Sequence, residues 1–217
     1  MNTKNNKTTK TIRKNDNMNE TKKEAFSYSI YNKENFESFK KLKVDTTAKS
    51  INRNDLPSEL SDETCEFIEL FRRKTANESI EWNFYIDYAE NEIIHCILGG
   101  SNQSLGWINT EEMKNRKILS IHNHPKNTYS APSAANFEIL EYEFEDYEII
   151  CSQEEFWILK AIGKYEIREK IHKDISIIFE SIKNSNSKNK NNIYSEIVIN
   201  YINNLNQKIV LTRKEYR

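Results

Sequence analysis

The fold is decided by two neighbouring runs, Glu81-Trp-Asn-Phe-Tyr-Ile-Asp-Tyr88 and Glu92-Ile-Ile-His-Cys-Ile-Leu98. In the first run, Trp82, Phe84 and Ile86 take every second position, which gives a β-strand one strongly apolar face. The second run is apolar through most of its length, and only a short Ala-Glu-Asn segment separates the two. We therefore expect a β-hairpin packed by one face against a core.

Further elements are predicted on both sides of this hairpin. Ser61 can cap a helix whose first turn holds Asp62 and Glu63, which are favourable at the positive end of the helix dipole. Downstream we expect a helical turn, a buried strand, a helix and two more strands, at residues 110–115, 117–122, 133–144, 147–151 and 156–162. The segment 57–163 is thus predicted to be one α+β domain of about five strands and two or three helices.

The two ends of the chain differ from this domain in composition. Residues 1–23 carry seven Lys or Arg against two acids and few large apolar residues, so we expect them to be disordered. The whole segment 1–56 is predicted to be a largely disordered tail, although its aromatic residues between 25 and 43 could dock weakly. Isoleucines at helical spacing between 167 and 182, and a second stripe between 193 and 205, predict that 164–217 is a helical extension.

Composition excludes several classes of protein. A formal charge of −1 gives no attraction of the whole molecule to nucleic acid or to an anionic membrane. The three cysteines show no CxxC spacing, which argues against a disulfide framework or an all-cysteine zinc site. No apolar run is long enough to span a membrane, and the N-terminus lacks the apolar core of a signal peptide. We therefore expect a cytoplasmic protein.

The stretch that carries chemistry joins His122-Asn-His-Pro125 to Pro132-Ser-Ala-Ala-Asn136. Two histidines leave the end of a predicted strand, and the second group opens the predicted helix. We expect the two rings to start on opposite sides of the strand and to converge on one metal if the backbone turns at Pro125. Zinc accepts two imidazoles and needs a third protein ligand plus a water to be catalytic.

This stretch resembles the motif of the JAMM (MPN+/JAB) metalloproteases, and it is most similar to the RadC-like branch, in which His-Asn-His-Pro is followed by Pro-Ser-x-x-Asp. The resemblance covers roughly residues 78–162. It implies a cytidine-deaminase-like mixed sheet flanked by helices. It also implies a zinc-dependent hydrolase of peptide or isopeptide bonds that acts on a protein or peptide.

The resemblance also implies a role for each matching residue. His122 and His124 would hold zinc, and Asn136 stands where the family has its third ligand, an aspartate. Ser133 would donate a hydrogen bond to the developing oxyanion. Glu81 would be the general base, since it lies on the strand face away from Trp82; Glu78, in the preceding connection, is the alternative.

Asn136 opens a second hypothesis. An amide oxygen is neutral and a weaker ligand than a carboxylate, so the predicted enzyme is impaired or inactive. The alternative is a catalytically degenerate JAMM-like module that binds a protein partner through its C-terminal helices. A third, weaker option follows the RadC resemblance to DNA-associated or mobile-element proteins, with the Lys-rich N-terminal arm on phosphates.

Structural roles compete with each of these assignments. The two histidines could bond to the backbone, Ser133 could cap the helix, and Glu81 could be an exposed strand carboxylate. His95, in the middle of a strand, is expected to be structural. A Cys–His nucleophile, for example His95 with a cysteine, would need a spatial adjacency that the sequence does not show.

Overall fold

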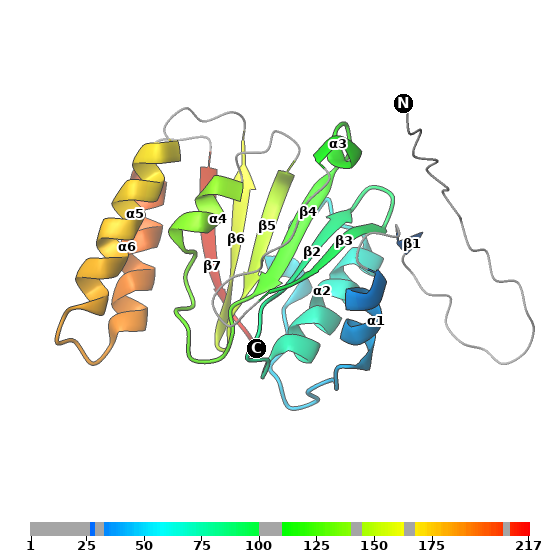
Figure 1. Cartoon of the computed structure of the whole chain (residues 1–217), viewed down its shortest axis with the longest axis horizontal. Coiled ribbons are helices and arrows are strands. Elements are labelled where there is room, and N and C mark those ends of the chain that lie inside the picture. Colours follow the sequence, from blue (N-terminus) through cyan, green and yellow to red (C-terminus); the bar gives the residue numbers. More distant parts are fainter. Residues whose placement is uncertain (1–26, 29–32, 100–109, 140–144, 163–167, 206–208) are drawn as a thin grey trace, which may run out of the picture.

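A computed structural model describes residues 27–28, 33–99, 110–139, 145–162, 168–205 and 209–217. These residues form a mixed seven-stranded sheet in the order β1-β3-β2-β4-β5-β6-β7 (Figure 1). The strands are β1 (Ser27–Tyr28), β2 (Trp82–Asp87), β3 (Glu92–Leu98), β4 (Ile118–Asn123), β5 (Glu145–Cys151), β6 (Glu155–Ala161) and β7 (Ile209–Glu215). The predicted α+β class and the central hairpin β2–β3 are confirmed.

Helices cover both faces of the sheet (Figure 1). They are α1 (Lys33–Lys41), α2 (Asp62–Thr75), α3 (Thr110–Met113), α4 (Ala134–Ile139), α5 (Arg168–Lys183) and α6 (Lys190–Asn204), with a 3-10 turn at Arg53–Asp55. Helices α1 and α2 pack on one face, and α4, α5 and α6 pack on the other. The predicted cap of α2 is confirmed, because the Ser61 side chain accepts a hydrogen bond from the Thr64 N–H at 3.0 Å.

The face toward α1 and α2 holds an aromatic core. Trp82 and Phe84 point into it from β2, as the alternation predicts. Phe39 of α1, 1% exposed, lies at its centre with ring centroids 4.7 Å from Phe84 and 5.6 Å from Trp82. The prediction that 1–56 is largely disordered is therefore wrong for residues 33–56. The aromatic residues of this segment, Phe36 and Phe39, pack against the strands of the folded sheet. Their burial therefore depends on tertiary structure. Residues 1–26 lie outside the described part of the chain.

The C-terminal segment also departs from the prediction. Helices α5 and α6 are present and pack on the sheet through Ile171, Ile175 and Val198. Residues 209–215, however, form strand β7, which pairs antiparallel with β6, so the segment is not wholly helical. A strand here covers the edge of β6, whose N–H and C=O groups would otherwise be open to other chains.

One connection places the candidate site. Strands β4 and β5 pair in parallel, and the chain between them contains the short helix α4. Parallel neighbours require such a crossover, so the carboxyl end of β4 and the start of α4 lie at the same end of the sheet. The predicted motif occupies these two places.

Candidate functional site

His122 and His124 lie close together at the carboxyl end of β4. Their ring centroids are 5.2 Å apart and the ring planes are inclined at 46°. The His124 N–H donates to the Cys151 carbonyl at 2.8 Å, which continues the pairing of β4 with β5. The expectation that the rings start on opposite sides was wrong, because residues two apart on a strand share a face. The pair therefore needs no turn at Pro125 to converge.

Asn136 approaches this pair from α4, and its oxygen is held by the helix cap. The Ser133 N–H donates to Asn136 Oδ1 at 2.6 Å, and the Ser133 hydroxyl donates to the same oxygen at 2.8 Å. Ser133 directly precedes α4, and Asn136 is the third residue of the helix. The bond from the Ser133 N–H is one half of a capping box, with an asparagine in the position usually taken by glutamate or glutamine, while the Asn136 N–H donates to the Ser133 carbonyl at 3.2 Å.

The nitrogen of the same amide faces the buried cluster. A backbone N–H can only donate, so the Ser133 bond identifies the Asn136 oxygen and leaves the NH₂ group on the other side. Asn136 Nδ2 lies 3.2 Å from His122 Nε2 and donates to Glu148 Oε1 at 3.0 Å. His122 Nε2 is thus an acceptor, so its hydrogen is on Nδ1, which lies 3.3 Å from the same Glu148 oxygen.

The second histidine has a similar tautomer. His124 Nδ1 lies 2.7 Å from the Tyr129 carbonyl oxygen, which can only accept, so Nδ1 carries the hydrogen and Nε2 keeps a lone pair. Burial lowers the pKa of His124 to about 4, and it lowers the pKa of His122 well below the usual 6.5. Both rings are therefore neutral near pH 7.

Three acidic side chains share this face of the sheet. Glu148 on β5 is fully buried, and Glu145, at the start of the same strand, is 3% exposed. Burial raises the pKa of Glu148 well above its ordinary value, and the charges of Glu145 and Glu81 raise it further. Glu81 is itself 9% exposed, so it is not an exposed strand carboxylate. Its role as general base stays a prediction. Glu78 lies in the connection before β2, as expected, where its carbonyl accepts from the Lys126 N–H at 3.1 Å.

These donors do not fit zinc as predicted. His124 offers a free lone pair, but the lone pair of His122 Nε2 faces the Asn136 NH₂ group, and the Asn136 oxygen points to Ser133. In the described part of the chain, no group of three His, Cys, Asp or Glu side chains is arranged to hold a metal ion. In this arrangement the Asn136 oxygen is turned away from the histidines, and the role of Asn136 as a metal ligand stays a prediction. The Ser133 hydroxyl donates to the Asn136 oxygen and, among the hydrogen bonds of the described residues, does not accept from a helix N–H, so its role as oxyanion donor stays a prediction.

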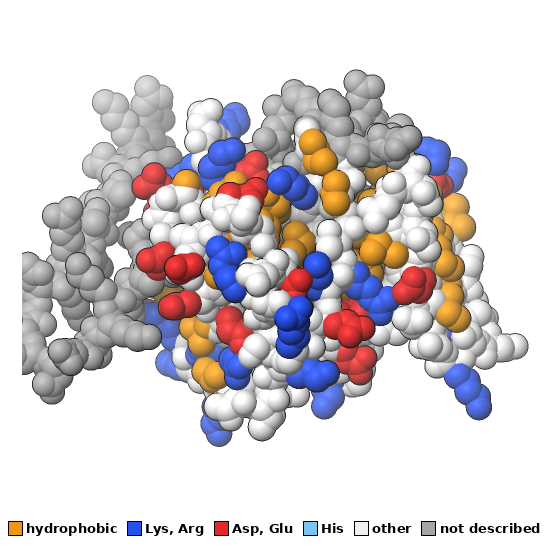
Figure 2. Space-filling view, turned by 180° about the vertical axis from the view of Figure 1, so that it is seen from behind, with side chains coloured by type: hydrophobic (Ala, Val, Ile, Leu, Met, Phe, Trp, Pro, Cys, Tyr) orange, Lys and Arg blue, Asp and Glu red, His pale blue; other side chains and the backbone are white. Residues whose placement is uncertain are grey.

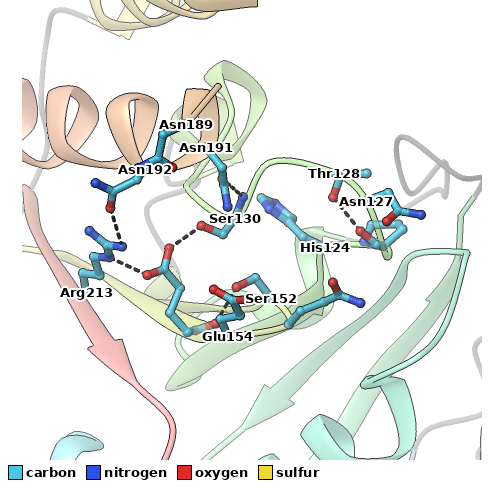
Figure 3. A pocket seen from close by; sticks show the side chains of 13 residues that line it. His124, Asn127, Thr128, Ser130, Ser152, Glu154, Asn189, Asn191, Asn192 and Arg213 are labelled. Atoms are coloured by element: carbon cyan, nitrogen blue, oxygen red, sulfur yellow. Dashed lines mark hydrogen bonds and ion pairs between the residues drawn. The ribbon is translucent and has the colours of Figure 1, made fainter. Parts of the chain in front are cut away.

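A polar pocket of about 320 Å³ opens beside His124 (Figure 3). At its floor, Glu155 accepts hydrogen bonds from both Ser130 and Arg213, so its charge is paired. Asparagine side chains dominate the rest of the wall, and Asn191 accepts from the Ser130 N–H at 2.9 Å. The pocket lining is His124, Pro125, Asn127, Thr128, Ser130, Ser152, Gln153, Glu154, Glu155, Asn189, Asn191, Asn192 and Arg213.

Two residues that support the site were missed in the sequence. Asn123 bridges β4 to the start of β2, because its side chain accepts from the Trp82 N–H at 2.8 Å and donates to the Ile80 carbonyl at 3.0 Å. Glu148 fixes Asn136 and His122. A single acid between Tyr147 and two isoleucines in a buried strand was the available signal for Glu148.

Comparisons of the chain with models of known protein families, with curated proteins and with solved structures found no match. Among the described residues, no helix is both long and apolar enough to cross a membrane. On the face seen in Figure 2, Lys and Arg side chains are interspersed with Asp and Glu. This surface therefore does not present the single-sign patch that a nucleic-acid backbone favours.

Proposed function

We propose that this chain is a JAMM-like domain whose catalytic site has become a metal-independent hydrogen-bonded cluster, and that it binds a protein partner. The fold supports the JAMM-like part of the proposal. A strand carrying His122 and His124, a loop, and a helix opened by Ser133 follow one another in a mixed sheet flanked by helices. Glu81 lies on the same face, one strand away.

The orientation of the Asn136 amide is the observation that carries the proposal. In an active site of this kind, the third residue must turn a lone pair toward the metal. Asn136 turns an NH₂ group to that side and bonds to His122 and Glu148. The Asn136 NH₂ group therefore donates hydrogen bonds to the His122 nitrogen and the Glu148 carboxylate, which in an active site would face the metal. Both rings are neutral and the Asn136 amide donates to His122 and Glu148, so these hydrogen bonds hold the three side chains together without zinc.

Such a cluster cannot supply the chemistry of the predicted hydrolase. The predicted zinc hydrolase depends on a water whose pKa is lowered by the metal, and a neutral amide does not lower the pKa of water. His124, with its pKa lowered to about 4, is also a weak base near pH 7. The remaining role of the cluster is structural, and it fixes α4 against β4 and β5.

The partner surface that we propose lies on α5 and α6. Three isoleucines of these helices are exposed: Ile177 at 53%, Ile193 at 37% and Ile197 at 40%. The first turn of α6 also lines the polar pocket through Asn191 and Asn192, directly before Ile193. Apolar side chains beside a hydrogen-bonding pocket are the combination that protein interfaces use.

Zinc content of the purified chain tests the proposal. We expect wild type to hold far less than one zinc per chain, and Asn136→Asp to gain zinc, because a carboxylate oxygen would replace the NH₂ group while the Ser133 cap is kept. His122→Ala in the Asn136→Asp background should lose that zinc, while His172→Ala, remote in sequence, should not. One zinc per wild-type chain, lost in His122→Ala, would refute the proposal.

One observation favours the hydrolase as the second candidate. The ring centroids of His122 and His124 are 5.2 Å apart, close enough for the two rings to share a metal, and the tautomer of His124 leaves its lone pair on Nε2. That function predicts zinc-dependent cleavage of a peptide or isopeptide bond by wild type, abolished by Glu81→Gln. The zinc measurement above separates the two candidates.

A further inference from the structure

Buried polar atoms without a hydrogen-bond partner gather beside the histidine cluster. Among the described residues they include both carboxylate oxygens of Glu145, Oε2 of Glu148 and the hydroxyl of Ser120. These three side chains are 3%, 0% and 1% exposed, respectively. Native proteins leave few buried polar atoms unpaired, so a group of them in one place calls for a ligand.

Strand pairing brings the three residues together. Ser120 on β4 is the direct partner of Glu148 on β5, and both share the sheet face of His122. The pairing shifts between Ile118 and Leu119, which leaves Glu145 near the same face. Ser120 lowers the pKa of Glu145, against the larger effect of burial, and the charge of Glu145 raises the pKa of Glu148. The Ser120 hydroxyl therefore lies near the Glu145 carboxylate, without a hydrogen bond of good geometry to it.

No positive charge of the described residues pairs with these two acids. The nearest basic group is His122 Nδ1, 3.3 Å from Glu148 Oε1, and burial keeps that ring neutral. Arg116, the cation on the neighbouring part of the sheet, is engaged by Asp87 at 3.4 Å and Glu92 at 2.5 Å. Burying two carboxylates without a counter-charge is expensive, so the pair must take up protons or a cation.

We infer that Glu145, Glu148 and Ser120 form a binding site for a hard divalent cation of the Ca²⁺, Mg²⁺ or Mn²⁺ type. The free donors are all oxygens, two carboxylates and one hydroxyl, which such ions prefer to nitrogen or sulfur. The site lies beside the histidine pair and shares Glu148 with the cluster around it, but its donors are oxygens and not imidazole nitrogens. It does not depend on the JAMM resemblance or on the proposed partner.

Occupation of the site stabilises the histidine cluster. Glu148 binds Asn136 and faces His122 through Oε1, whereas Oε2 is the oxygen left for the cation. A cation keeps Glu148 ionised, and a charged acceptor strengthens the bond from the Asn136 amide. The cation thus couples β5 to α4 through one carboxylate.

Titration calorimetry on the full chain, freed of metal with EDTA and held at pH 7.5, tests the inference. CaCl₂, MgCl₂ and MnCl₂ are added separately, and at least one should bind with a stoichiometry of one. Glu145→Gln and Glu148→Gln should each weaken that binding by at least about 10-fold, because each removes a charged ligand. Ser120→Ala should weaken it less, since a water can take the place of a neutral ligand. Glu111→Gln, which changes a 74% exposed carboxylate, is the matched control and should leave the affinity unchanged.

Paramagnetic broadening of NMR signals by Mn²⁺ locates the site. It is measured on wild type, so it tests the inference even if the variants fail to fold. In wild type, the amide signals of Ser120 and Glu148 should broaden at substoichiometric Mn²⁺, before those of Glu111. Absence of 1:1 binding by all three ions would show that protons alone neutralise the two acids and would overturn the inference. Binding that is unchanged in Glu145→Gln, or broadening centred elsewhere, would overturn it equally.

Discussion

The two faces of the central sheet are built on opposite principles. The face toward α1 and α2 is almost wholly apolar, and Phe39, Phe84 and Ile86 there are at most 1% exposed. The other face interrupts its apolar packing with buried His122, Glu145 and Glu148. The same strands, β2, β4 and β5, contribute to both faces. The second face also has an apolar core, beneath α5 and α6, but its buried polar side chains near β4 and β5 are retained at a cost in free energy.

The largest effect is expected from breaking the apolar face. Phe39→Ala should lower the free energy of unfolding by about 3–5 kcal/mol, because it removes a buried aromatic ring and leaves a cavity. Urea denaturation followed by circular dichroism measures this. Leu70→Ala on α2, where the side chain is 38% exposed, is the matched control and should cost far less. Equal costs for the two variants would mean that Phe39 is not the centre of the core.

The buried acids of the polar face should make the free energy of unfolding depend on pH. Burial raises the pKa of Glu145 from 4.5 to about 8, so folding takes up protons and the stability falls as pH rises through this range. In EDTA, wild type should lose at most about 1.4 kcal/mol per pH unit through this group, or roughly 3 kcal/mol between pH 5 and pH 8. Glu145→Gln should flatten this dependence.

The control for this prediction is the same measurement with a saturating divalent cation, which should also flatten the curve. Because the lowered pKa values of His122 and His124 make stability rise with pH below 6.5, the test is the difference between wild type and Glu145→Gln. A slope that Glu145→Gln leaves unchanged would show that Glu145 is not a buried, raised-pKa carboxyl.

A smaller loss is expected at α4, which packs on the polar face of the sheet. Asn136→Ala removes hydrogen bonds to Ser133, His122 and Glu148 and should cost about 1–3 kcal/mol, since buried partners are left unpaired. Ser133→Ala removes only the hydroxyl of an exposed residue and keeps its N–H bond, so it should cost less. If Ser133→Ala proved the costlier variant, the cap rather than the buried cluster would be what Asn136 stabilises.

The smallest change in stability is expected on the outer surface of α5 and α6. Ile197→Ser should change the free energy of unfolding by less than about 0.5 kcal/mol, because the side chain is 40% exposed. The same variant should lower self-association or the affinity for a bound protein partner, measured by sedimentation velocity. A large destabilisation without any effect on association would place Ile197 in the core and not in an interface.

The apolar face could be predicted from the sequence because its signal is local. The predicted second strand, 92–98, matches β3, and the alternation of Trp82 and Phe84 in β2 gave the correct inward face. Helix α1 and strand β7 were missed because each has few apolar residues, and its buried ones, such as Phe39 and Leu211, pack on elements distant in sequence. Contacts of that kind depend on the tertiary structure, and a short stretch of sequence does not show them.

The sequence predicted which residues come together at the candidate site, but it did not predict how their side chains are hydrogen-bonded. The motif brought His122, His124 and Asn136 to one place, as expected. The spacing Ser-x-x-Asn satisfies a metal motif and a capping box equally, and only the hydrogen bond from the Ser133 N–H shows which end of the amide faces inward. Glu148 escaped notice because its partner, Asn136, is on a different element.

The central claim is that the Asn136 amide, and not a metal, completes the histidine cluster. Nitrogen-15 NMR of the two imidazole rings, recorded with and without one equivalent of Zn²⁺, tests it most directly. We predict that His122 and His124 of wild type both carry their hydrogen on Nδ1, and that Zn²⁺ leaves the Nε2 shifts unchanged. Movement of both Nε2 signals to metal-bound values at one equivalent would contradict the account.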